Sequence, residues 1–465
     1  MKMTVSSNDT IAAVATAMSP SGIGIVRMSG EDSLAVISRI FQPEKVDKDI
    51  SKVDTHTIHY GHIFDKDEMI DEVLVMIMKG PHSYTGEDTV EIDCHGGVLA
   101  VKKVLEAAVR YGARPAQPGE FTRRAFLNGR IDLSKAEAVI DVINAKSEYA
   151  LKSSLSQLKG SLEQRIKEIR QSIIYQIAFI ESALDDPEHI SIDRYGEQLK
   201  EILMTEKGKI QELIDSADEG RMIQEGIKTV IVGKPNAGKS SLLNLLVGEE
   251  KAIVTDVAGT TRDVLEETII LQGISLRIID TAGIRSTEDV VEKIGVGRAK
   301  ERAKEADLIL YVVDSSVPLD KNDEEIIEMI RTGKKKAIVL LNKSDLNLKV
   351  SADDMKHYLP VPVISISAKE ETGLKELEEC MKDMFFLGEL SFNDEIYITN
   401  MRHKAALEET KRSIELVERS IEDGMPEDFF SIDLRNAYES LGSITGEAVG
   451  EDLVNEIFGK FCTGK

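Results

Sequence analysis

The sequence predicts a multidomain protein of class α/β plus α, in which a doubly wound α/β domain interrupts a helical domain that follows an N-terminal α/β domain. Three observations predict this. Short apolar runs alternate with turn residues over the first part of the chain, and long charged segments with helical periodicity cover 134–215 and 393–459. Between these two segments, apolar strands alternate with loops and helices. A helical region divided by a complete second domain is most simply one domain with an insertion.

The N-terminal α/β domain is expected over 1–120. Its strand candidates are the apolar runs TIAAVAT, GIGIVRM, VLVMIM and TVEI, separated by the turn signals SPSG, KGPHSYTG and CHGG. One apolar-periodic helix is predicted from Val98 to Tyr111. The helical domain should then occupy 121–221 and 388–465, with the insertion over 222–387. Its first part contains a single proline between residues 134 and 215, Pro187.

Length, composition and net charge limit the number of domains and the kinds of partner that the protein can have. A chain of 465 residues, 42% of them apolar, can form two to four domains with hydrophobic cores. The net charge of −24 argues against nonspecific coating of nucleic acid, although a local basic patch can still hold an RNA. The longest strongly apolar run, from Val73 to Met78, is far shorter than the ~20 residues of a membrane span. The N-terminus MKMTVSSNDT also lacks the apolar core of a signal peptide.

We therefore expect a cytoplasmic protein with no membrane partner. The three cysteines, Cys94, Cys380 and Cys462, form no CxxC pair. For Cys94 and Cys380 this favours reduced thiols in a cytosolic protein.

The insertion is organised around Gly233 to Ser241, GKPNAGKSS, which follows the apolar pair Ile231 and Val232 and precedes the helical pattern LLNLLVGEE. This is GxxxxGKS between a strand and a helix, where backbone N–H groups wrap a triphosphate. A bare match is equally compatible with a glycine-rich turn. Lys239 would neutralise the β and γ phosphates, and the Ser240 hydroxyl would hold Mg²⁺. The predicted nucleotide contacts of this loop are Asn236, Ala237, Gly238, Lys239, Ser240 and Ser241.

Three further elements identify the nucleotide as GTP. The sequence Asp280, Thr281, Ala282, Gly283 follows an apolar run, so that Asp280 can reach Mg²⁺ through water and the Gly283 N–H can contact the γ phosphate. The carboxylate of an NKxD element can accept hydrogen bonds from N1 and N2 of guanine, which adenine cannot offer. Ser367, Ala368 and Lys369 would contact the guanine O6. Four ordered elements at strand ends predict a P-loop G domain with a Ras-like doubly wound sheet. The NKxD residues are Asn342, Lys343 and Asp345.

A further loop carries two adjacent threonines, one of which must complete the Mg²⁺ shell when the loop closes on the γ phosphate. Its predicted GTP contacts are Thr255, Asp256, Val257, Ala258, Gly259, Thr260 and Thr261, and Thr261 is the predicted Mg²⁺ ligand. In this class of GTPase a glutamine that orients water often follows DTAG. Here the residue is Ile284, which cannot do so. The attacking water must be positioned by a partner, a cation or another residue.

The chain resembles the MnmE (TrmE) family of tRNA modification GTPases over all three regions and both termini. The resemblance rests on GKPNAGKSSLLN, TDVAGTTRD, DTAGIR, NKSD, SGIGIVRMSG, SYTGEDTVEIDCHGG, PGEFTRRAFLNGRIDLSKAEAV and the terminal FCTGK. It implies that 1–120 is a tetrahydrofolate-binding and dimerisation domain, that the chain is a homodimer, and that it forms a heterotetramer with an MnmG-type flavoprotein carrying the FAD. The implied reaction installs a carboxymethylaminomethyl-type group on C5 of the wobble uridine 34 of certain tRNAs, using 5-formyl- or methylene-tetrahydrofolate.

The resemblance also implies residue roles. Asn236 matches the family residue that holds K⁺ beside the phosphates, together with the backbone carbonyls of Thr255, Val257 and Thr260. The alternative interpretation is that the Asn236 side chain only caps the loop. Glu292 matches the glutamate that orients water in the family. Without the resemblance, it would be interpreted as a solvent-exposed charge on a helix. Lys239 is the second residue expected to act in catalysis. Cys462 is either a nucleophile or dispensable.

For the one-carbon site the matching positions are Arg27, Glu91, Arg130 and Lys465. A folate presents a carboxylated glutamate tail that suits Arg or Lys, and a pterin edge that suits a carboxylate. Arg130 stands where some relatives are expected to have Lys, which keeps the charge but changes its geometry. Without the resemblance, Arg27 and Arg130 would be interpreted as surface charges.

Two other functions remain open. A nonenzymatic RNA-assembly switch would predict a basic RNA-binding module after the G domain, and the acidic helical sequence from Glu395 onward argues against it. A folate-dependent transferase with a regulatory G domain would lack the flavoprotein partner and the tRNA.

Overall fold

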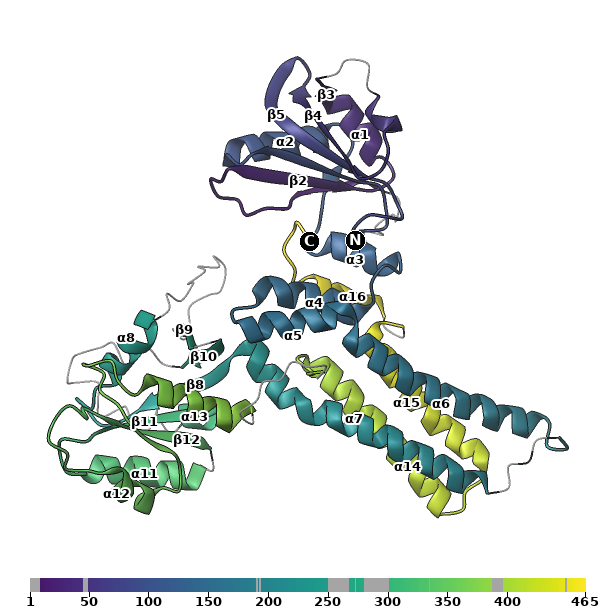
Figure 1. The fold of residues 1–465 in the computed structure, drawn as a ribbon. Helices are drawn as coiled ribbons and strands as arrows, with labels where there is room; N and C mark the ends of the chain where they lie inside the picture. Colours follow the sequence, from purple (N-terminus) through teal and green to yellow (C-terminus); the bar gives the residue numbers. More distant parts are fainter. Residues whose placement is uncertain are drawn as a thin grey trace. The chain divides into compact units, whose positions relative to one another are not determined.

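The computed structural model describes residues 9–44, 49–189, 191, 194–249, 267–271, 273–279, 301–333, 335–386, 396–447 and 450–465 (Figure 1). The chain divides into two compact units. The first consists of residues 1–140, 158–171 and 438–465, and the second of residues 141–157 and 172–437.

The first unit contains a seven-stranded sheet with the order β3-β4-β5-β6-β2-β1-β7. All its neighbouring strands are antiparallel except β1 and β7. The strands are β1 (Ile11–Val14), β2 (Ile23–Ser29), β3 (Phe41–Pro43), β4 (Thr57–Asp65), β5 (Glu68–Met78), β6 (Thr89–His95) and β7 (Arg114–Pro115). The helical elements of this region are α1 (Ser33–Ile40), η1 (Ile50–Lys52), α2 (Val98–Arg110) and α3 (Glu120–Leu127).

Alternation along β6 shows how the sheet is built. Val90 and Ile92 are buried in a core that also contains Val104 and Ala108 of α2. Glu91 and Asp93 therefore point to the opposite face, because successive strand residues face opposite sides of a sheet. This places chemistry-bearing side chains on the face away from α2.

The four predicted apolar runs form β1, β2, β5 and β6, and the predicted helix is α2, so these predictions are confirmed. The helix α1 is an addition that the sequence prediction did not include. Its eight residues cover just over two turns, which is too short for a clear helical period to appear in the sequence.

The helical segments match the predicted regions. They form α4 (Leu133–Asn144), α5 (Glu148–Lys159), α6 (Ser161–Asp185), α7 (Tyr195–Glu225), α14 (Met401–Glu422), α15 (Glu427–Thr445) and α16 (Glu451–Phe458). Helix α6 ends at Asp185, close to Pro187, because a proline disfavours helical geometry in the residue before it. In the second unit α7 and α14 pack side by side, with an ion pair of 2.5 Å between Lys207 and Glu418 (Figure 1).

The insertion contains a six-stranded sheet with the order β13-β12-β11-β8-β10-β9. Its neighbouring strands are parallel except β9, which is antiparallel to β10. The strands are β8 (Ile227–Val232), β9 (Glu267–Leu271), β10 (Ile274–Ile278), β11 (Leu308–Asp314), β12 (Lys336–Asn342) and β13 (Val363–Ser365). The described helices of this domain are α8 (Lys239–Glu249), α11 (Lys321–Gly333), α12 (Ala352–Tyr358) and α13 (Leu374–Phe386).

Every residue of the central strand β11 is buried, as expected for a parallel strand covered on both faces. The loops that follow parallel strands lie at one edge of the sheet, where doubly wound folds bind ligands. Within the described ranges, no helix is long and apolar enough to cross a membrane.

Candidate functional site

The loop between β8 and α8 is folded around the side chain of Lys239. The Lys239 ammonium donates hydrogen bonds to the carbonyl oxygens of Gly233 at 2.8 Å and Lys234 at 2.9 Å. Asn236 adopts a φ of 62°, and the Ala237 N–H donates to the Lys234 carbonyl at 3.3 Å, which closes the turn. The loop therefore presents a positive charge at the N-terminus of α8, where backbone N–H groups also favour anions.

Asn342, at the end of β12, connects two loops that are distant in sequence. Its Nδ2 donates to the Ala237 carbonyl at 2.9 Å, and its Oδ1 accepts from the Ala368 N–H at 3.1 Å. A Cβ at Gly238 would lie 2.0 Å from Asn342 Nδ2, so only glycine fits there. The predicted P-loop, NKSD and SAK elements are thus brought together around one buried amide.

Asp345 presents a carboxylate beside these loops. Ser367 Oγ donates to Asp345 Oδ1 at 2.7 Å, and the Glu370 N–H donates to Ser367 Oγ at 3.2 Å. The Ser367 hydrogen bond, together with the charges of Lys369 and Lys343, holds the pKa of Asp345 below its ordinary value. The exposed carboxylate is therefore ionised near neutral pH and can accept two hydrogen bonds from a guanine edge.

Lys343 is held by the end of the neighbouring strand. Its ammonium pairs with Asp314 Oδ2 at 2.5 Å, and its φ is 64°. Burial acts to raise the pKa of Asp314, but hydrogen bonds from Lys343 and Ser316 lower it below the ordinary value. The pair fixes the backbone between Asn342 and Asp345.

A buried ion pair in the P-loop was not identified by sequence reasoning. Lys234 Nζ lies 2.7 Å from Asp323 Oδ2 of α11, and the Tyr311 hydroxyl donates to the other oxygen at 2.9 Å. Asp323 is fully buried. The partners are 89 residues apart, and no motif spacing connects them.

Part of the predicted nucleotide site lies outside the described residues. These residues are Thr255, Asp256, Val257, Ala258, Gly259, Thr260, Thr261, Asp280, Thr281, Ala282, Gly283 and Glu292. The second Mg²⁺ ligand, the three K⁺-binding carbonyls and the water-orienting glutamate therefore stay predictions. In the part of the chain that the structure describes, no group of three His, Cys, Asp or Glu side chains could hold a metal ion.

The four predicted folate residues come together in the first unit. Arg27 and Glu91 are cross-strand partners on β2 and β6, and Arg27 Nε lies 2.6 Å from Glu91 Oε1. Three cations surround the ring of Tyr84, with centroid distances of 5.6 Å from Arg27, 5.3 Å from Arg130 and 5.6 Å from Lys465. Burial and the nearby Arg27 charge lower the pKa of Lys465. This crowding of positive charge favours an anionic ligand.

The C-terminal tail is anchored on the N-terminal region of the same chain. The Gly119 N–H donates to the Cys462 carbonyl at 3.2 Å, and the Gly464 carbonyl accepts from Arg27 at 3.3 Å. A Cβ at Gly464 would lie 2.3 Å from the Val14 carbonyl oxygen, so the backbone of the tail lies directly on the end of β1. The exposed thiol of Cys462 belongs to the same tail. The tail thereby brings Lys465 beside Tyr84 and near Arg27, as the four matching positions of the one-carbon site require.

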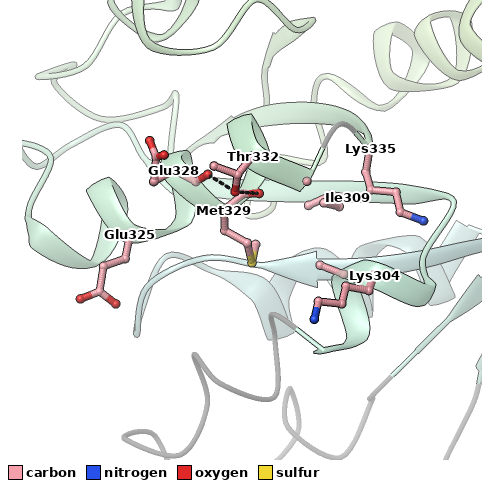
Figure 2. A pocket seen from close by; sticks show the side chains of 9 residues that line it. Lys304, Ile309, Glu325, Glu328, Met329, Thr332 and Lys335 are labelled. Atoms are coloured by element: carbon pink, nitrogen blue, oxygen red, sulfur yellow. Dashed lines mark hydrogen bonds between the residues drawn. The ribbon is translucent and has the colours of Figure 1, made fainter.

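A separate cavity of about 680 Å³ lies beside α11 (Figure 2). Thr332 Oγ1 donates to the Glu328 carbonyl of its own helix at 2.8 Å, so the hydroxyl is satisfied locally. None of the predicted site residues lines this cavity. Its lining residues are Ala303, Lys304, Ile309, Glu325, Glu328, Met329, Thr332, Gly333 and Lys335.

Comparison with known proteins identifies the family. A model described as the MnmE helical domain matches residues 133–462, and one described as the GTP-binding protein TrmE N-terminus matches residues 10–130. The tRNA modification GTPase MnmE of Lachnoclostridium phytofermentans is 59% identical over 457 residues, which cover 98% of this chain and 99% of that protein. The chain belongs to the MnmE family of tRNA modification GTPases. The predicted resemblance is confirmed.

Other relatives are similar over the same extent. The tRNA modification GTPase MnmE of Thermoanaerobacter pseudethanolicus is 50% identical and that of Clostridioides difficile is 48% identical, each over 98% of this chain and 99% of the relative. The solved G domain of the T. maritima FeoB iron transporter covers 34% of this chain and 97% of its own length at 27% identity. Its TM-score of 0.26 is too low to support a conclusion.

Proposed function

We propose that this chain binds and hydrolyses GTP as part of a tRNA modification reaction. The observation that carries the proposal is the network around Asn342, which joins the P-loop to the 366–370 loop beside an ionised Asp345. A carboxylate in that position complements the N1–H and N2–H donors of guanine. The names of the relatives support tRNA as the object of the reaction.

Guanine recognition is tested by changing the hydrogen-bonding groups at residue 345 and on the base together. Xanthine has an oxygen where guanine has its 2-amino group, so the amide of Asp345→Asn complements xanthine and not guanine. We expect GTP affinity to fall by roughly 10²- to 10⁴-fold and XTP affinity to rise, because two charge-assisted hydrogen bonds are exchanged. Equilibrium binding of fluorescent nucleotides measures both changes.

Asp353→Asn is the matched control. The Asp353 side chain is 96% exposed on α12, and this variant should keep wild-type affinities for both nucleotides. An Asp345→Asn protein that still prefers GTP would contradict the proposed guanine contact.

For the chemistry of hydrolysis we propose one Mg²⁺ and one K⁺. Ser240 and Thr261 would hold Mg²⁺, and Asn236 with the carbonyls of Thr255, Val257 and Thr260 would hold K⁺. A cation there supplies positive charge to the transition state. Lys239 binds phosphate, and Glu292 is proposed to orient water because Ile284 cannot.

This proposal predicts that GTP hydrolysis is faster in K⁺ than in Na⁺. We expect a difference of about tenfold or more at fixed ionic strength, which disappears in Asn236→Ala. Asn322→Ala, a change at an exposed position of α11, should keep the difference. Equal wild-type rates in the two salts would exclude the K⁺ assignment.

For the N-terminal domain we propose a site for 5-formyl- or methylene-tetrahydrofolate made by Arg27, Glu91, Arg130 and Lys465. The supporting observation is the convergence of Arg27, Arg130 and Lys465 on Tyr84, which suits the carboxylates of a glutamate tail. Such an anion would relieve the mutual repulsion of these cations. Cys462 lies on the same tail and is proposed as a candidate nucleophile.

We further propose that the chain acts as a homodimer with a flavoprotein partner of the MnmG type, which carries the FAD. The proposed product is the carboxymethylaminomethyl group on C5 of wobble uridine 34. Mass spectrometry of wobble nucleosides from a deletion strain tests this, since the modified uridine should disappear and return on complementation. Unchanged nucleosides would reject the assignment.

A further inference from the structure

The hairpin of β9 and β10 is held by residues that lie outside the nucleotide-binding motifs. Tyr149, the second residue of α5, places its ring against Gly273 at the turn of the hairpin. A Cβ at Gly273 would lie 3.0 Å from Tyr149 Cε2 and 3.3 Å from Cδ2. Lys146, just before α5, donates from Nζ to Thr268 Oγ1 of β9 at 3.3 Å.

The end of α7 holds the same hairpin through β10. Gly226 ends α7 with a φ of 88°, and a Cβ there would lie 2.8 Å from Ser275 Oγ. Ala150 of α5 and Ile223 of α7 are buried in one hydrophobic core with the hairpin residue Leu271. The hairpin is therefore packed against two helices of the helical domain.

The two strands of the hairpin lead directly to two of the predicted phosphate-contacting motifs. Strand β9 begins at Glu267, shortly after Thr261 in the sequence, and β10 ends at Ile278, shortly before Asp280. Glu267 and Ile278 are paired in the ladder, so both strand ends emerge together. Because paired strands move as a unit, a displacement at either predicted phosphate-contacting motif acts on the whole hairpin.

Helix α5 is in turn connected to both segments that join the inserted domain to the helices. Ser154 Oγ lies 3.3 Å from Gln224 Oε1 near the end of α7 and shares its one proton between that oxygen and the Ala150 carbonyl at 2.9 Å. Gln157 Nε2 donates to the Tyr397 carbonyl at 3.0 Å and to Thr399 Oγ1 at 3.1 Å, where the chain leaves the inserted domain. A displacement of α5 by the hairpin would therefore reach both connections.

We propose that Tyr149 and Lys146 are positioning residues that couple the nucleotide state of the G domain, through β9–β10 and α5, to tRNA modification. The inference rests on the proposed GTP hydrolysis. It requires that the hairpin occupy two arrangements, each favoured by a different nucleotide state, since a ligand shifts only equilibria between states that it binds differently. Coupling between sites is typically worth about 5- to 150-fold.

The first test separates hydrolysis from modification. Tyr149→Ala should keep GTP turnover within about twofold of wild type, because the contact that the change removes is with the hairpin turn at Gly273, and should lower tRNA modification by about fivefold or more. Tyr149→Phe retains the ring on Gly273 and should restore modification. Tyr175→Ala, at a tyrosine that is 65% exposed on α6, is the matched control and should change neither activity.

The second test measures whether a change of nucleotide state in the G domain alters the dynamics of α5. Amide hydrogen exchange of the full chain is compared between GDP and GDP with aluminium fluoride. In the wild type, exchange along α5 should differ between the two states. In Tyr149→Ala the difference should persist in β9–β10 and disappear in α5.

A third test isolates the contact at the turn. Asparagine tolerates positive φ better than other residues with a Cβ, so Gly273→Asn mainly adds a clash with the Tyr149 ring. Gly273→Asn should lower modification, and adding Tyr149→Ala should cause little further loss, because neighbouring residues in one contact are not additive. Gly424→Asn, at a glycine with φ of 65° and open space around it, should be neutral.

The outcomes distinguish this inference from the proposed function. The proposed coupling is wrong, and GTP hydrolysis is unaffected as a proposal, in either of two cases. In the first, Tyr149→Ala modifies tRNA normally. In the second, hydrogen exchange in wild-type α5 is the same in both nucleotide states. Loss of GTP hydrolysis in Tyr149→Ala also overturns the coupling, because the residue would then support folding of the G domain. A wild-type chain without GTP hydrolysis would reject the proposed function and the inference together.

Discussion

Asn342 is 2% exposed, and its amide satisfies the Ala237 carbonyl and the Ala368 N–H at the same time. In Asn342→Ala both backbone groups lose their partner in a buried site. Each unsatisfied buried group costs about 1–3 kcal/mol, so we expect a loss of roughly 2 kcal/mol or more in the stability of the inserted domain. The midpoint of its urea unfolding transition measures this in the nucleotide-free chain.

The control for this prediction is Asn322→Ala, at an exposed position of the same domain. It should change the free energy of unfolding by less than about 0.5 kcal/mol, as surface substitutions usually do. Equal midpoints for Asn342→Ala and wild type would show that the amide serves recognition without supporting the loops.

At the same scale, the sequence predicts residues that a motif defines and misses those that packing defines. Asn342 and Asp345 follow from NKSD, and the structure adds the Ser367 hydroxyl that holds Asp345. The Lys234–Asp323 pair has no sequence signal, because the packing of α11 alone brings Asp323 to the P-loop. Removing either partner of such a buried pair leaves the other charge buried without compensation. Both Lys234 and Asp323 are therefore needed for the P-loop to keep this packing.

Among the elements, α16 depends on aromatic packing to hold the tail. The Phe458 ring lies 5.4 Å from the Phe461 ring and 6.3 Å from the Phe126 ring of α3, measured between centroids. Phe458→Ala should cost about 3–5 kcal/mol in unfolding free energy, because it leaves a cavity in a buried cluster. Guanidinium unfolding of the first unit measures it.

Leu127→Ala is the matched control in the same unit, since Leu127 is 64% exposed on α3. Its effect should stay below about 1 kcal/mol, as for most surface changes. A Phe458→Ala protein with wild-type stability would mean that the tail is held by its backbone contacts alone.

Element prediction succeeds where periodicity extends over several turns or strand pairs. The alternation of TVEI predicts β6, and the helical period predicts α2 almost to its last residue. Short elements such as β3 and α1 carry too few residues for a period. The end of α7 depends on Gly226, whose positive φ stops the helix next to β8, and periodicity alone cannot locate such a residue.

For the whole molecule, the sequence predicts the insertion because helical periodicity returns after the strands of the G domain. The family model described as the MnmE helical domain matches residues 133–462, a range that includes the predicted insertion. The placement of the tail could not be derived from periodicity, because Arg27 and Gly464 are 437 residues apart and meet only through tertiary packing. The only sequence-based indication of that contact is that Arg27 and Lys465 both match positions of the one-carbon site.

The tail leads to a prediction that separates the two activities of the chain. Fixing each backbone residue costs about 1–2 kcal/mol in conformational entropy, so the contacts of residues 462–465 with Gly119, Val14 and Arg27 must offset that cost. Removing residues 462–465 deletes the Lys465 charge beside Tyr84 and the thiol of Cys462. We expect 5-formyl-tetrahydrofolate binding to weaken by about tenfold or more and tRNA modification to be abolished.

GTP hydrolysis of the truncated chain should stay close to wild type, because every predicted G motif lies far from the tail in sequence and none of its residues is removed. Isothermal titration with the folate, nucleoside mass spectrometry and phosphate release measure the three properties on one preparation. Lys460→Ala, at a lysine that is 71% exposed on the same tail, should leave all three unchanged. Normal modification by the truncated chain would reject the role of the tail, and lost hydrolysis would show that the tail acts on folding.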